Sequence, residues 1–141
     1  MTEPLLDAML SLTALMEEES EKLALNPYLP ELPEIAAAKL RLAGQIEAAF
    51  ARLKREAPED WAAELDPEAR ERLAEASRCL RDASRVNAQI LARQIELSVD
   101  MMAAIAAEAQ RVTGSRSSTY GACGGLSGMD APAPISINAR L

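Results

Sequence analysis

No glycine or proline interrupts the chain from Glu68 to Val112, and this long stretch constrains the fold more than any other feature. The residues before it, Asp66 and Pro67, form a helix start signal, because Asp is a favoured N-cap and proline fits the first helical position. Gly114 suits a C-terminal cap. The helix over 67–112 would be about 70 Å long at 1.5 Å per residue. A chain built on such a rod offers surface rather than a pocket, which indicates a binding protein.

The composition is typical of a helical bundle or coiled coil. Apolar residues make up 49% of the chain, but aromatic residues make up only 3%, so the apolar content comes from Ala, Leu, Ile and Met. The length of 141 residues allows one domain with a modest core. With 22 acidic and 15 basic residues the net charge is −7, which argues against a nucleic-acid partner.

The sequence predicts a cytoplasmic protein. No run approaches about 18 apolar residues, so we expect no membrane insertion. The first residues, Met-Thr-Glu-Pro-Leu, lack the basic region of a signal peptide. The two cysteines, Cys79 and Cys123, are too few for a disulfide framework, which favours a reducing compartment.

Two shorter helices are expected before the long one, over 4–24 and 33–56, separated by a proline-rich segment. Thr2 is placed to cap the first helix, and Glu19 belongs to an acidic run that we expect to be solvated. Lys39 interrupts the stripe of the second helix, where its stem can lie along the apolar seam while its ammonium reaches water. Trp61 is expected to staple the following turn to the bundle. The apolar stripes are Leu5, Met9, Leu12, Met16 and Leu23 in the first helix, and Ile35, Leu42, Ile46, Ala49 and Leu53 in the second.

These patterns predict an all-α fold: an elongated antiparallel three-helix bundle or coiled coil with a long third helix. Asn87 and Gln94 share one seven-residue series with Leu73, Leu80 and Met101, so we interpret them as polar layers that fix helix register. Between Ile90 and Ile105 the apolar residues spread over about 220° of the helix, where ~100° suffices to face a core. Either two short helices pack on both flanks of this arc, or part of it faces a partner.

From residue 114 the sequence becomes rich in glycine, serine and proline. We therefore expect a helical bundle over 1–113 and a flexible tail over 114–141. In this tail, Ile135, Ile137 and Leu141 are placed to clasp a bound partner, and Tyr120 has no local apolar neighbours.

Signals of catalysis are absent from the sequence. The chain has no histidine, and its cysteines are too isolated to be metal ligands. The glycines from Gly121 to Gly125 are not a phosphate loop, because no apolar strand precedes them. We expect a non-enzyme without cofactor or metal.

Four motifs follow one another along the chain, before a tail that ends in Ala-Pro-Ala-Pro-Ile-Ser-Ile-Asn-Ala-Arg-Leu. They are Leu12-x-x-Leu-Met-Glu-Glu-Glu19, Leu32-Pro-Glu-Ile-Ala-Ala-Ala-Lys39-Leu-x-Leu42, Asn87-x-x-Ile-Leu91 and Thr119-Tyr120-Gly121-x-x-Gly124. This ordered set resembles the FlgN-type flagellar type III export chaperones, in particular their proteobacterial branch. The proline-rich segment before Pro33 departs from the more continuous helical passage of that family.

The resemblance implies a cytoplasmic chaperone that binds hook-associated (hook-filament junction) proteins and delivers them to the flagellar type III export gate. It implies a cargo-binding part between Leu91 and Val112, and docking on the cytoplasmic domain of the export gate through Tyr120 and Gly121. The free protein would be a monomer or a weak homodimer. The cargo-binding residues expected from it are Leu91, Ile95, Val99, Met102 and Ile105.

Two alternatives stay open at the level of sequence. The first is a structural or adaptor coiled-coil protein whose wide apolar arc is buried in a stable homodimer. The second is an amphipathic protein that coats lipid or polymer granules, which the acidic balance disfavours for anionic membranes.

Overall fold

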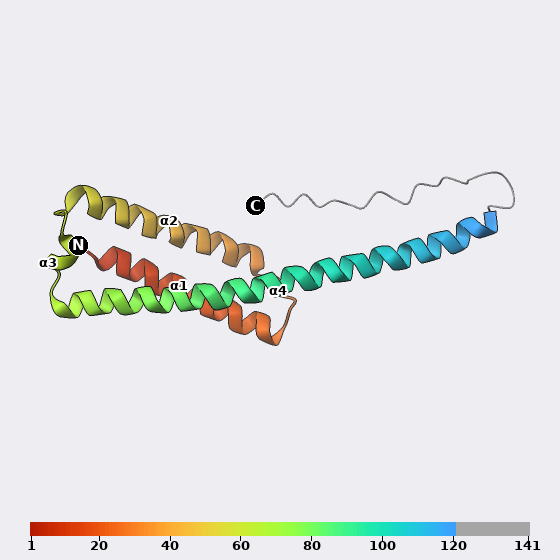
Figure 1. The fold of residues 1–141 in the computed structure, drawn as a ribbon, viewed down its shortest axis with the longest axis horizontal. Coiled ribbons are helices and arrows are strands. Elements are labelled where there is room, and N and C mark those ends of the chain that lie inside the picture. The colour runs from red at the N-terminus through yellow and green to blue at the C-terminus, as the bar shows by residue number, and fades with distance from the viewer. Residues whose placement is uncertain (121–141) are drawn as a thin grey trace. The chain divides into compact units, whose positions relative to one another are not determined.

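The computed structural model describes the backbone of residues 1–120 and the side chains of residues 1–114 (Figure 1). This part of the chain contains four helices and no strand, which confirms the all-α fold. The helices are α1 (Glu3–Leu25), α2 (Leu32–Glu56), α3 (Trp61–Glu64) and α4 (Pro67–Tyr120). The chain divides into two units, Met1–Gln94 and Ile95–Leu141, and α4 contributes to both.

In the first unit, α1, α2 and the first part of α4 form an up-down-up bundle (Figure 1). One end of the bundle is held by a cluster of buried apolar residues, and at the other end Glu19 of α1 contacts Lys39 of α2 and Asn87 of α4. These contacts make α2 antiparallel to both α1 and α4. The cluster consists of Leu5, Leu6, Met9, Leu53 and Ala76, with Ile46, Ala49, Ala57, Trp61, Leu73 and Leu80 packed against it.

Helix α1 buries four residues of the predicted stripe and leaves the fifth, Met16, half-buried, and one of its acids does not behave as predicted. Leu12 and Leu23 are buried, and Glu19, expected to be solvated, is only 1% exposed. The reason is spacing: residue 19 lies seven positions after Leu12 and four before Leu23, so it shares their face of the helix. Thr2 occupies the N-cap position, but its side chain makes no capping hydrogen bond.

The turn between α2 and α4 is held by aromatic and apolar packing. Trp61 packs against the core cluster, as predicted, and its ring meets that of Phe50 edge-to-face at a centroid distance of 6.4 Å. The sequence did not predict helix α3, which is a single turn around Trp61. This turn closes the end of the bundle that carries the apolar cluster.

The start of α4 follows the predicted signal. The carboxylate of Asp66 accepts a hydrogen bond from the backbone N–H of Ala69 at 2.7 Å, so Asp66 is the N-cap. The guanidinium of Arg70 donates to the carbonyl oxygen of Ala63 at 2.7 Å, which ties α4 to the end of α3. Both contacts fix the direction in which the long helix leaves the turn.

The end of α4 differs from the prediction. The helix does not stop at Thr113 and Gly114 but continues to Tyr120. Gly114 is not in the left-handed conformation of a C-terminal cap, and a Cβ built on it would meet no atom within 4 Å. A glycine inside a helix costs only about 1 kcal/mol relative to alanine, and no proline follows to end the hydrogen-bond ladder. Tyr120 is therefore the last helical residue rather than part of a tail.

Candidate partner-binding surface

Helix α4 carries a continuous set of exposed apolar side chains beyond the bundle-forming unit. Their exposed fractions range from 39% at Val112 to 65% at Met101. We call this set the exposed apolar face of α4. Its members are Ile95, Leu97, Val99, Met101, Met102, Ile105 and Val112.

This face continues a series of positions that is buried in the first unit. Ala76, Ala83 and Asn87 of α4 are 3%, 7% and 3% exposed. Steps of seven or four residues from Asn87 lead through Gln94 to Met101, Ile105 and Val112. At about 100° per residue, the seven residues of the exposed apolar face spread over about 200° of the helix, more than a single core contact requires. The sequence pattern is that of a buried helix, but the side chains are exposed.

Charged side chains are few around this face. Arg111 binds Glu108 at 2.6 Å, and both side chains are well exposed. The hydrogen bond from Arg111 holds the pKa of the Glu108 carboxyl below its usual value. By the same 100° arithmetic, Glu96 and Asp100 lie on the opposite side of the helix, and Glu108 is the one acid of this stretch that falls within the face. The face is therefore suited to an apolar partner rather than to a strongly charged one.

The structure separates the predicted cargo-binding residues into two groups. Leu91 is half-buried and belongs to the first unit, whereas the other four are exposed members of the face. Val112, the last residue of the predicted cargo-binding part, also belongs to the face. Three further predictions fall outside the described part of the chain: the side chain of Tyr120, all of Gly121, and the clasp residues Ile135, Ile137 and Leu141.

A buried polar cluster links all three long helices within the first unit. The Lys39 ammonium donates to Glu19 Oε1 at 2.7 Å and to Asn87 Oδ1 at 3.2 Å. The Asn87 amide donates to Glu19 Oε1 at 2.7 Å and to Ser20 Oγ at 3.1 Å. Lys39 was expected to extend to water, but its ammonium instead turns to these partners, and its side chain is 18% exposed. No buried side-chain polar atom in the described range lacks a hydrogen-bond partner.

This cluster explains how one of the two predicted polar layers fixes helix register. Asn87 is buried and bonds to groups of α1 and α2, so a shift of α4 along the bundle would leave its buried amide without partners and would take one of two partners from the Glu19 carboxylate. That is how a polar residue on an apolar seam fixes helix register. Gln94, the second predicted layer, is only half-buried, and its side chain forms no hydrogen bond within the described residues. The register is therefore set at Asn87.

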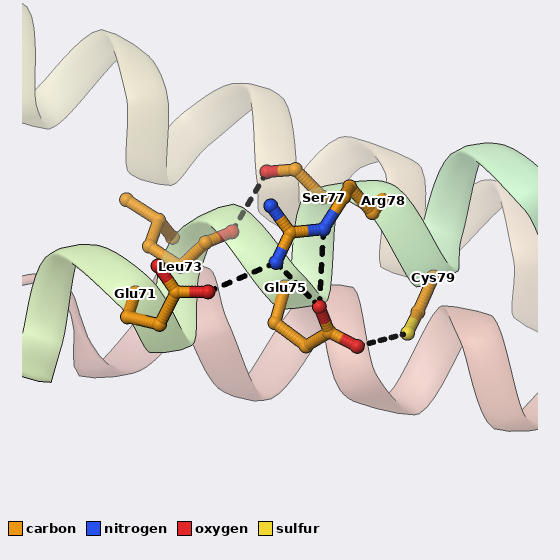
Figure 2. Close-up of polar contacts among 6 residues, drawn as sticks. All are labelled: Glu71, Leu73, Glu75, Ser77, Arg78 and Cys79. Carbon is orange, nitrogen blue, oxygen red and sulfur yellow. Dashed lines mark hydrogen bonds and ion pairs between the residues drawn. The ribbon is translucent and has the colours of Figure 1, made fainter.

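A chain of polar contacts follows α4 on its side toward α1, around Cys79 (Figure 2). Arg78 bridges Glu71 at 3.0 Å and Glu75, and the Cys79 thiol donates to Glu75 at 3.6 Å. Burial, followed by the negative charge of Glu75, raises the pKa of Cys79 above its usual value. A raised pKa lowers the thiolate fraction of Cys79, which makes it a weaker nucleophile than an ordinary cysteine.

Two general properties of residues 1–120 bear on function. No helix in this range is both long enough and apolar enough to cross a membrane. Within the same range, no group of three or more His, Cys, Asp or Glu side chains is arranged to hold a metal ion. Comparisons with protein-family models, with curated proteins and with solved structures find no match for this chain.

Proposed function

We propose that the protein is a cytoplasmic, non-enzymatic export chaperone that holds hook-associated flagellar proteins on the exposed apolar face of α4. In this proposal it delivers them to the flagellar type III export gate, as the resemblance to FlgN-type chaperones implies. The observation that carries the proposal is that seven large apolar side chains lie along one helix, each at least 39% exposed. A group of exposed apolar side chains of this kind is typical of a site for a protein partner.

The chemistry of the face suits a partner that must be bound and later released. Met101 and Met102 are unbranched and polarisable, so they repack readily against cargo of different shape. Ile95, Val99 and Ile105 are exposed apolar side chains, so their burial against an apolar helix is favourable. The bundle in the first unit supplies a core that does not depend on this face, which leaves it available for binding.

The test compares two triple variants of the full chain. Replacing Ile95, Met102 and Ile105 by serine removes the centre of the face, and we expect binding of purified hook-associated proteins to weaken at least tenfold, which corresponds to about 1.4 kcal/mol. The matched control places serines on the opposite side of the same helix, in Ala103→Ser, Ala107→Ser and Gln110→Ser, and should bind like the wild type. This control introduces the same number of serines into the helix.

Two results would contradict this proposal. If both triple variants bind cargo equally, the face is not the cargo site. If the wild-type chain forms a stable homodimer that the first variant dissociates, and no hook-associated protein binds, then the face joins two copies of an adaptor protein instead. Sedimentation equilibrium on the same samples distinguishes these outcomes.

Delivery to the export gate is tested separately at the end of α4. Tyr120 is the last helical residue, and an aromatic ring there provides a large contact area with few rotatable bonds. We expect Tyr120→Ala to retain cargo binding and to reduce secretion of hook-associated proteins. Normal secretion by this variant would remove Tyr120 from the proposal, while leaving cargo binding intact.

A further inference from the structure

A groove lies between α1 and α4 in the first unit, away in the sequence from the exposed apolar face. Two adjoining shallow hollows form it, and Cys79 lines both. Its floor is apolar, and Leu10 and Val86 in it are 49% and 42% exposed. Leu6 and Ala76 complete the floor of the first hollow.

The rim of this α1/α4 groove is acidic on both sides. Glu17 and Glu21 line it from α1, and Glu71, Glu75 and Asp82 line it from α4. One basic residue, Arg72 of α4, also lines the first hollow. The negative charge of the groove is therefore greatest at the second hollow, which is lined by three acids and no basic residue.

The carboxylates differ in whether they already hold a cation. Glu71 and Glu75 bind the guanidinium of Arg78, so the α4 rim demonstrably accepts a basic group. Glu17, Glu21 and Asp82 form no ion pair within the described residues. These three are the groups available to a cation from outside the chain.

The length and shape of the groove specify the form of its occupant. The lining residues of α4 run from Glu71 to Val86, a distance of about 22 Å at 1.5 Å per residue. A helix of about 15 residues covers that distance. Because α1 and α4 run parallel here and α2 packs against them elsewhere, a further helix would complete a four-helix bundle.

We propose that the α1/α4 groove binds an amphipathic helix of about four turns from a partner protein, with an apolar stripe on the floor and Lys or Arg side chains on the acidic rim. This docking site goes beyond the proposed cargo site, because it lies in the other unit and selects its partner by charge. It gives the protein two surfaces of different chemistry, one apolar and one apolar with an acidic rim.

The test uses the full chain with Cys123→Ser, so that Cys79 is the single cysteine and reports on the groove. The probe is a 16-residue helical peptide with leucines at helical spacing flanked by lysine and arginine, and the control peptide carries glutamate in place of those bases. We expect the basic peptide to bind at least tenfold more tightly than the acidic one and to slow the alkylation of Cys79. Its affinity should fall as salt is added.

Matched protein variants locate the binding. The first variant neutralises the three carboxylates that hold no cation, by Glu17→Gln, Glu21→Gln and Asp82→Asn together. We expect its affinity for the basic peptide to fall at least tenfold. A control with the same change of net charge, Glu34→Gln, Glu47→Gln and Asp60→Asn together, should leave its affinity unchanged within about twofold. Circular dichroism checks that both variants are folded.

Several outcomes would overturn the proposal. If the peptide binds without protecting Cys79 from alkylation, it occupies the exposed apolar face. The same conclusion follows if only the serine variant of Ile95, Met102 and Ile105 loses peptide binding. Protection of Cys79 that rises with protein concentration, together with a doubled mass, would make a second copy the occupant. Faster alkylation after removal of residues 121–141 would make the chain's own tail the occupant. None of these outcomes bears on cargo binding, which the serine variants test independently.

Discussion

Replacing Lys39 by methionine tests the energetic role of the buried polar cluster. The change keeps an unbranched apolar stem on the stripe of α2 and removes only the ammonium group. Glu19 Oε1 then loses its 2.7 Å contact with Lys39 and keeps a single hydrogen bond from the Asn87 amide. Because Glu19 is 1% exposed, water cannot replace the lost partner without opening the bundle.

The magnitude follows from the burial of the pair. Removing one partner of a buried ion pair costs about 3–5 kcal/mol, because it leaves an uncompensated charge. Since the side chain of Lys39 is 18% exposed, the pair is not fully removed from water, and we expect the lower limit of about 3 kcal/mol. For a unit of this size, that lowers the melting temperature by about 12 °C or more.

The assay is chemical and thermal denaturation followed by far-UV circular dichroism, with Lys22→Met as the matched control. Lys22 pairs with Glu18 at 3.0 Å, but both side chains are exposed, at 44% and 57%. Solvent and salt screen such a pair, so we expect the control to melt within about 2 °C of the wild type. The comparison separates the effect of a buried partner from the loss of a lysine.

A second variant keeps the argument testable if Lys39→Met fails to fold. Adding Glu19→Gln to Lys39→Met removes the uncompensated charge while the amide oxygen still accepts from Asn87. We expect this double variant to be more stable than Lys39→Met alone by at least about 1 kcal/mol. The reasoning is refuted if Lys39→Met loses no more stability than Lys22→Met.

Three further predictions concern single positions in the first unit. Gly44→Ala should stabilise the fold by about 0.5–1 kcal/mol, because Gly44 lies inside α2 and a Cβ there meets no atom within 4 Å; a lower melting temperature would contradict this. Asp66→Ala should destabilise it by about 1 kcal/mol in urea unfolding, because the N-cap bond to the Ala69 N–H is lost, and an unchanged midpoint would contradict that. In a Cys123→Ser background, Cys79 should react with iodoacetamide more slowly at pH 8 than a free thiol and become reactive only at higher pH, because its raised pKa reduces the thiolate fraction; equal rates would contradict the burial argument.

The sequence predicted the helices well because their signals are local. The Asp66 N-cap and the apolar stripes depend on residues within a few positions of one another, and the structure reproduces the three long helices closely at their starts. The end of α4 was mispredicted for a complementary reason. Gly114 is compatible with either a cap or a helix interior, and the sequence around it does not distinguish the two.

The polar cluster was only partly predictable, because its contacts join residues far apart in the chain. Asn87 on an apolar seam signalled a polar layer, but its partners on α1 and α2 depend on how three helices align. Glu19 shared a face with buried leucines, a signal that its membership in an acidic run concealed. For the exposed face of α4, the width of the apolar arc indicated a surplus over core needs, and only the structure shows where burial stops.

The most direct measurement for the central claim is hydrogen–deuterium exchange of the full chain, alone and saturated with a hook-associated protein. The account predicts that backbone amides of residues 95–112 exchange faster in the free protein than those of the bundle helices, since their apolar side chains are exposed. Cargo should then slow exchange across residues 95–112, with the largest change around Met101 to Ile105. A complex in which these residues exchange as fast as in the free protein, while protection appears only within residues 1–94, would contradict the account.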